Sequence, residues 1–249
     1  MSELMQLIKE RKHKLESSKL SLSMKDGNLP VQERLSFIPS MLFFVMGFKD
    51  VLETLEVKDT TDPIQKKVNT HCLEDEGHWR WYLHDLKELE FNSSYLNNTK
   101  YKIFELLWHD DHKAAREMIY QTIHYSKLSA GIPGAKLVII EVLEAAFAAF
   151  LSNMHKLVKE AGLFDTLEYF GKRHQDQEDN HSIGSWLDEE QHKNSLEKDI
   201  PAEHIPFTQQ VINNLFDHFD AMFDCWYAMQ KPVPVEKNVL AEISQPSLS

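Results

Sequence analysis

Helical periodicity runs through almost the whole of this sequence, and no stretch of any length alternates polar and apolar residues as a strand would. Apolar residues return every three or four positions, which places them on one face of an α-helix. The 249 residues include only 8 glycines and 9 prolines, so the chain has few places for tight turns. We therefore expect an all-α fold.

Turn signals divide the chain into about seven long helices. We expect them at residues 2–18, 31–55, 63–89, 94–129 (one helix or two), 136–161, 164–191 and 206–231. Asp62 is expected to cap the third helix, with Pro63 at its first position, and Gly162 to end the most apolar one. The connections are short and no repeat or low-complexity linker occurs. We expect one bundle-like domain over residues 1–232 and a loosely held tail at 233–249.

Charge and cysteine content limit the partners and the compartment. A formal net charge of −12 argues against a nucleic-acid binder, because phosphate binding needs clustered Lys and Arg. Only two cysteines occur, Cys72 and Cys225, which suits a reducing compartment. The charged N-terminus differs from a signal peptide, and no unbroken apolar run approaches the roughly 18 residues that span a membrane. We expect a cytoplasmic protein with no membrane partner.

A stripe of two histidines and one glutamate lies in the sixth expected helix. His174, Glu178 and His181 stand at spacings of four and then three, so they share an arc of roughly 60° on a helix. Continued upstream, the same seam passes through Leu167 and then Phe170 or Gly171. The helix positions that lie outside the stripe, between its three residues, are polar. The stripe is therefore expected to face the core, where a bundle would place leucines.

The third expected helix carries a similar stripe of His71, Glu74 and His78, at spacings of three and four. A third component comes from Glu141 and Glu144 in the most apolar helix, where at least one carboxylate is expected to be buried. A buried carboxylate costs several kcal/mol unless it is paired, protonated or bound to a cation. Two divalent ions would satisfy all of these groups together.

Mixed histidine and carboxylate ligands suit iron or manganese, and zinc is an alternative. Each feature also has a simpler interpretation. One buried histidine is more often a hydrogen-bonded core residue, and one polar triad is usually a solvated helix face. Two triads in inward registers, with glutamates in the most apolar helix, favour a metal site over both.

Three motifs occur in order along the chain: HCLEDEGHWRWYLHDLKEL, VLEAAF and YFGKRHQDQEDNH. Together they resemble the haem-oxygenase-like superfamily. More closely, they resemble its branch of iron-containing redox enzymes, the haem-oxygenase-like diiron oxidases. The early stretch LSLSMKDGNLPVQERLSFIPSMLFFVMGF is similar to the opening helices of that superfamily. The resemblance covers roughly residues 5–230.

The resemblance implies a single-domain haem-oxygenase-like bundle in which two iron ions are ligated by Glu74, His78, Glu144, His174, Glu178 and His181. His71 is the alternative to Glu74, and Glu141 is the alternative to Glu144. Glu178 stands where many relatives have Asp. The aromatic residues Trp81, Tyr82 and Phe147 are expected to line a substrate pocket. Dimers are common in the superfamily, so a homodimer is expected.

The first functional hypothesis is a non-haem diiron oxidase or oxygenase that uses O2 to oxidise a small organic substrate. Two alternatives stand beside it. One is a metal-independent, thiaminase-II-like hydrolase that would depend on Cys225. The other is a non-catalytic helical binding protein whose polar seam holds water. Bound metal separates the first hypothesis from both others.

Overall fold

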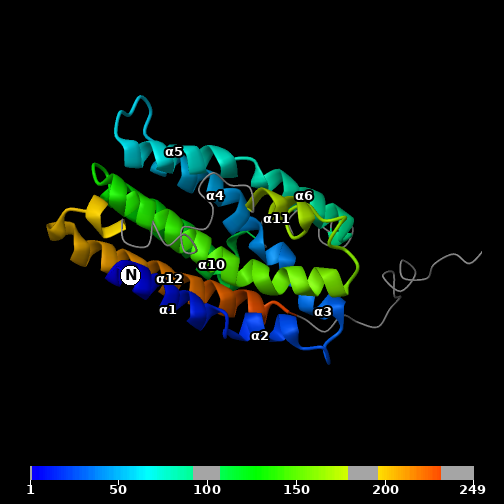
Figure 1. Cartoon of the computed structure of the whole chain (residues 1–249). Coiled ribbons are helices and arrows are strands. Elements are labelled where there is room, and N and C mark those ends of the chain that lie inside the picture. The colour runs from blue at the N-terminus through cyan, green and yellow to red at the C-terminus, as the bar shows by residue number, and fades with distance from the viewer. Residues whose placement is uncertain (1, 92–106, 179–195, 231–249) are drawn as a thin grey trace, which may run out of the picture.

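All regular elements are helical in the computed structural model, which describes residues 2–91, 107–178 and 196–230 (Figure 1). The α-helices are α1 (Glu3–Leu15), α2 (Lys19–Lys25), α3 (Val31–Leu35), α4 (Leu42–Leu55), α5 (Pro63–Asp75), α6 (His78–Glu88), α9 (Lys113–Leu128), α10 (Pro133–Glu160), α11 (Lys172–Glu178) and α12 (Ile205–Ala228). Short 3₁₀ segments occur at η1 (Ile38–Met41), η2 (Asp110–His112), η3 (Leu196–Asp199) and η4 (Ala202–His204). The predicted all-α fold is confirmed.

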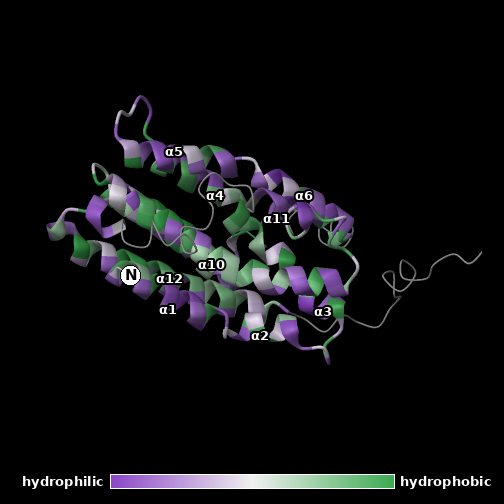
Figure 2. Cartoon of the chain, viewed as in Figure 1, coloured by the Kyte–Doolittle hydropathy of each residue, from purple (hydrophilic) through white to green (hydrophobic). Residues whose placement is uncertain are grey.

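Helix α10 lies at the centre of the bundle, where α1, α2, α5, α9 and α12 pack against it. Its side chains are buried on most sides, as its nearly continuous apolar sequence predicts. Figure 2 shows α4 and α10 as largely hydrophobic, while α1, α5 and α6 also carry many hydrophilic residues. The amphipathic outer helices therefore enclose a more apolar interior.

Two described segments have the length and mean hydropathy to cross a membrane, Val31–Leu55 and Pro133–Glu160. Neither is an unbroken apolar run. In the second, 78% of the apolar window is buried inside the fold, which is the behaviour of a central bundle helix. The absence of a membrane partner stays a prediction.

Two helix boundaries follow the signals read from the sequence. The Asp62 side chain accepts hydrogen bonds from the backbone N–H groups of Ile64 and Gln65, and Pro63 is the first residue of α5. Helix α10 ends at Glu160, and Gly162 follows with a φ of +70° that suits glycine. Both predictions are confirmed.

The helix expected at residues 31–55 is divided into α3, η1 and α4, and the one expected at 63–89 is divided into α5 and α6. The helix expected at residues 2–18 ends at Leu15. A short helix that was not expected, α2, follows it, and the Ser18 side chain caps α2 by accepting from the N–H of Ser21. In the third expected helix, α5 ends at Asp75 and α6 begins at His78. Gly77 lies at this break and has low helix propensity.

The expected helix from residue 164 is wrong over its first two turns, because residues 164–171 form turns and bends and α11 begins only at Lys172. The Asp85 carboxylate accepts the backbone N–H groups of 168–170, which a helix would use internally. A Cβ at Gly171 would lie 2.0 Å from the carbonyl oxygen of Leu167, so only glycine fits there. The expected tail at 233–249 lies outside the described residues.

Candidate metal centre

Three acidic and imidazole side chains from α5 and α10 converge inside the bundle. His71 and Asp75 lie one turn apart on α5, and Nε2 of His71 is 3.0 Å from Oδ2 of Asp75. The same nitrogen is 3.2 Å from Oε1 of Glu144 on α10. One ligand atom from each of the three residues lies within 4.8 Å of the other two. We call these three residues the triad.

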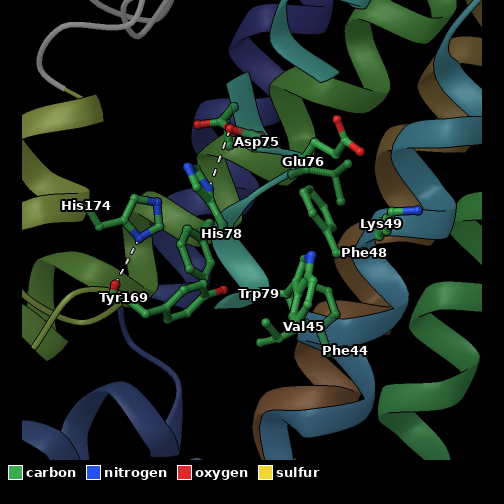
Figure 3. A pocket seen from close by; sticks show the side chains of 13 residues that line it. Phe44, Val45, Phe48, Lys49, Asp75, Glu76, His78, Trp79, Tyr169 and His174 are labelled. Carbon is green, nitrogen blue, oxygen red and sulfur yellow. Dashed lines mark hydrogen bonds and ion pairs between the residues drawn. The ribbon is translucent and has the colours of Figure 1, made fainter. Parts of the chain in front are cut away.

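Two more histidines, His78 and His174, lie near Asp75 of the triad (Figure 3). His78, at the start of α6, places Nδ1 3.7 Å from Oδ1 of Asp75. The ring of His174, from α11, lies 4.6 Å from the ring of His78 between centroids. Residues nearly 100 positions apart in the sequence therefore meet at one place. We call the triad together with His78 and His174 the polar core.

Most of the polar core is inaccessible to water. His71, Asp75, His78 and His174 are buried, and Glu144 is half-buried. Buried ionisable groups need compensating charges or hydrogen bonds. In the polar core these groups compensate one another.

The electrostatics of the triad favour a protonated imidazole when no metal is bound. Burial alone would lower the pKa of His71, but its hydrogen bonds with Asp75 and Glu144 outweigh burial and raise that pKa well above the usual range. Burial and the nearby Glu144 raise the pKa of Glu141 to about 8. Glu141 is therefore a neutral carboxylic acid at pH 7, while His71 is an imidazolium.

Asp75 was not among the residues proposed from the sequence, which favoured its neighbour Glu74. The interruption after Asp75 means that His71, Glu74 and His78 do not lie on one continuous helix. Asp75 joins the triad, whereas Glu74 lies outside it and is half-buried. The i, i+4 spacing from His71 to Asp75, followed by Gly77, is the signal that could have identified Asp75.

The other predicted ligands fall into three groups. His78, His174, Glu144 and the alternative ligand His71 are brought together in the polar core. Glu141 is buried one turn from Glu144 on α10. Glu178 is the last residue of α11, and its side chain is not described; His181 lies outside the described residues.

A pocket opens beside the polar core (Figure 3). Its polar wall includes Asp75, His78, Glu144 and His174. Its apolar wall is formed by residues of α4 and α10 together with two further aromatic side chains: Phe44, Val45, Phe48, Trp79, Leu143, Phe147 and Tyr169. The pocket therefore places ionisable groups beside an apolar and aromatic wall.

The three aromatic residues expected at the pocket take different places. Phe147 lines it. Trp81 stacks on His78, with ring centroids 4.5 Å apart, and meets the ring of His174 edge-on. Tyr82 is fully buried, and its hydroxyl donates to the carbonyl oxygen of Ile38 at 2.7 Å. Trp81 thus packs against two histidines of the polar core, whereas Tyr82 packs against Tyr169 and Phe170.

The donor atoms of the polar core fit a metal. Its described residues offer two carboxylates and three imidazoles, a mixture that suits iron, manganese or zinc. Two of the three histidines and both carboxylates also line the pocket, so an ion held there would lie next to a bound substrate.

Cys225 has the properties of an inert thiol. Its Sγ donates to the carbonyl oxygen of Asp111 at 2.7 Å, and burial together with Asp111 raises its pKa to about 11. A nucleophilic cysteine needs the opposite shift. Cys225 lies on α12 and is not among the described residues that line the pocket.

Comparison with known proteins adds no assignment to this site. No family model matches the sequence, and no curated protein is significantly similar to it. The functional argument therefore depends on the donor set and the pocket.

Proposed function

We propose that the protein is a metal-dependent oxidoreductase, a diiron oxidase or oxygenase that oxidises a small organic substrate with O2. The observation that carries this proposal is the convergence of His71, Asp75 and Glu144 beside an apolar pocket. Separate buried histidines and carboxylates are ordinary, but three that converge on one point next to a pocket are typical of a metal site.

The triad would hold one ion. His78 and His174 would contribute to a second ion. Glu178 and His181, which share the predicted stripe of His174, would complete the ligands of that ion. Iron bound there supplies redox chemistry with O2 that side chains alone cannot provide. Manganese and zinc remain alternatives from the donor set.

The side chains around the ions have their own tasks. Asp75 and Glu144 offset the positive charge, and His71 must lose its proton before Nε2 can bind an ion, so metal affinity should rise with pH. The aromatic wall of the pocket would exclude water and orient an apolar or aromatic part of the substrate against the polar core.

The two alternatives predict different behaviour. A binding protein would keep the His71 imidazolium paired with Asp75 and Glu144 and would retain no metal. A thiaminase-II-like hydrolase would need Cys225 as a nucleophile, which its raised pKa disfavours. The homodimer, the cytoplasmic location and the absence of a nucleic-acid partner stay predictions.

The test is O2 uptake by protein that was purified without a metal-chelating tag and loaded anaerobically with Fe(II). We expect uptake and a change in absorbance in the wild type and in Cys225→Ala, and neither in His174→Ala. Circular dichroism checks that each variant folds. Equal behaviour of the wild type and His174→Ala, with no uptake in either, would exclude the diiron proposal.

A further inference from the structure

Asp85 on α6 is fully buried, and the proposed metal site does not use it as a ligand. Its Oδ1 accepts the backbone N–H of Glu168 at 2.7 Å, and its Oδ2 accepts those of Tyr169 and Phe170, both at 2.9 Å. Nδ1 of His84 lies 3.2 Å from Oδ1 of Asp85. One carboxylate therefore binds three consecutive backbone donors from a segment more than 80 residues away.

The segment held by Asp85 in turn contacts His174. The carbonyl oxygen of Tyr169 lies 2.9 Å from Nδ1 of His174 (Figure 3). A carbonyl oxygen can only accept a hydrogen bond, so Nδ1 carries the proton and Nε2 of the neutral ring is an acceptor. A histidine needs such a proton-free nitrogen to bind a metal.

Backbone hydrogen bonds also hold the segment that leads to His174 in place. The N–H of Lys172 donates to the carbonyl of Phe164 at 2.8 Å, and the N–H of His174 donates to that of Glu168 at 3.1 Å. Gly171 lets the chain close tightly at this point. The segment therefore has little freedom to move relative to Asp85.

Asp85 also links the two histidines of the polar core. It stands seven residues after His78 on α6, about 10 Å along the helix axis. Through the 168–170 segment it fixes the position of the chain that enters α11 and carries His174. A shift of this segment would therefore change the distance between the two imidazoles.

We propose that Asp85 is a positioning residue: by holding residues 168–170 it places the Tyr169 carbonyl so that His174 is fixed as the Nδ1–H tautomer, with Nε2 left for a ligand. The role of Nε2 as a metal ligand rests on the proposed function. The tautomer itself is a property of the metal-free protein and is tested separately.

The experiment is long-range ¹H–¹⁵N NMR of metal-free protein labelled with ¹⁵N-histidine, at a pH where His174 is neutral. The His174 signals are those that disappear in His174→Gln. We expect the Nδ1–H tautomer in the wild type. An Nε2–H tautomer there would overturn the proposal, and this result needs no variant at Asp85.

In Asp85→Asn, one acceptor is lost and an amide donor faces backbone N–H groups. We expect His174 to shift toward the Nε2–H tautomer that free imidazole side chains favour, and Fe(II) affinity to fall about tenfold or more. Phe216→Leu on α12 is the control for a destabilised core, and it should leave the tautomer unchanged. If Asp85→Asn retains the wild-type tautomer, or if Phe216→Leu changes it equally, the proposal is wrong. A tautomer shift in a protein that binds no iron would support the role of Asp85 and contradict the proposed function.

Discussion

Two neighbouring parts of helix α10 face interiors of opposite character. In its C-terminal half, Phe150 packs with Phe37, Phe223 and Trp226, at ring-centroid distances of 6.0 to 6.1 Å. We call these four residues the aromatic core. Less than two turns earlier, Glu144 faces the polar core.

The two cores differ in what stabilises them. The aromatic core is stabilised by burial of large apolar side chains and by ring contacts. The polar core buries charged groups, and an apolar cluster of similar volume would often be as stable or more so. A sequence that keeps such a costly cluster beside a pocket points to a ligand, because departures from the packing rules concentrate at functional sites.

The largest effect should come from the aromatic core. Phe223 is buried among Phe150, Phe219 and Trp226. Phe223→Ala should lower the free energy of unfolding by about 3–5 kcal/mol, because it leaves a cavity. Urea denaturation measures this. Iron bound per folded chain should stay at the wild-type value, and a parallel loss of iron would show that the two cores are not independent.

The polar core and the neighbouring Glu141 should make stability depend on pH. The pKa of Glu141 is about 8 in the folded protein and near 4.5 in the unfolded chain, so folding takes up a proton between these values. Its contribution to stability is therefore complete below pH 4.5 and is lost as pH rises through 8. His71 acts in the same direction above its ordinary pKa of 6.5.

Between pH 5.5 and 7.5, Glu141 alone should lower the free energy of unfolding of metal-free protein by about 2–3 kcal/mol. Urea denaturation across this range, in the presence of a chelator, measures the change. Glu141→Gln keeps a neutral side chain of the same shape, so its stability should vary less with pH. If the free energy of unfolding of Glu141→Gln falls with pH as steeply as that of the wild type, Glu141 is not the source of the pH dependence.

A smaller effect, on Fe(II) affinity, should distinguish the neighbouring carboxylates Asp75 and Glu74. Asp75→Asn should weaken Fe(II) binding by at least about tenfold, which is about 1.4 kcal/mol, because it removes a member of the triad. Glu74→Gln is the matched control and should bind within about threefold of the wild type. Anaerobic Fe(II) titration distinguishes them. The reverse order would favour the ligand set proposed from the sequence.

The sequence was a good guide where a feature depends on local pattern. Periodicity predicted the all-α fold, Asp62 and Pro63 predicted the start of α5, and the polar stripes placed His71, His78 and His174 facing inward. These features depend on residues within a few turns of one another. Local chemistry was enough to predict them.

Sequence pattern failed where contacts between distant residues decide the structure. Residues 164–171 have a helical pattern, but Asp85, more than 80 positions earlier, takes their backbone donors. The break after Asp75 likewise interrupts the expected stripe, and Asp75, which the stripe did not include, lies beside His71. The first result cannot be read from a local window, because tertiary interactions override propensity there. The second had a local signal in the i, i+4 spacing from His71 to Asp75 followed by Gly77.

The most direct test of the central claim is the number of iron ions per chain. Protein without a chelating tag is loaded anaerobically, desalted and analysed by inductively coupled plasma mass spectrometry, together with Glu144→Gln and Cys225→Ala. We predict close to two irons per chain in the wild type and in Cys225→Ala, and a clear loss in Glu144→Gln. Wild-type protein that retains no iron would contradict the metal site and leave the polar core as an ion-paired structural network.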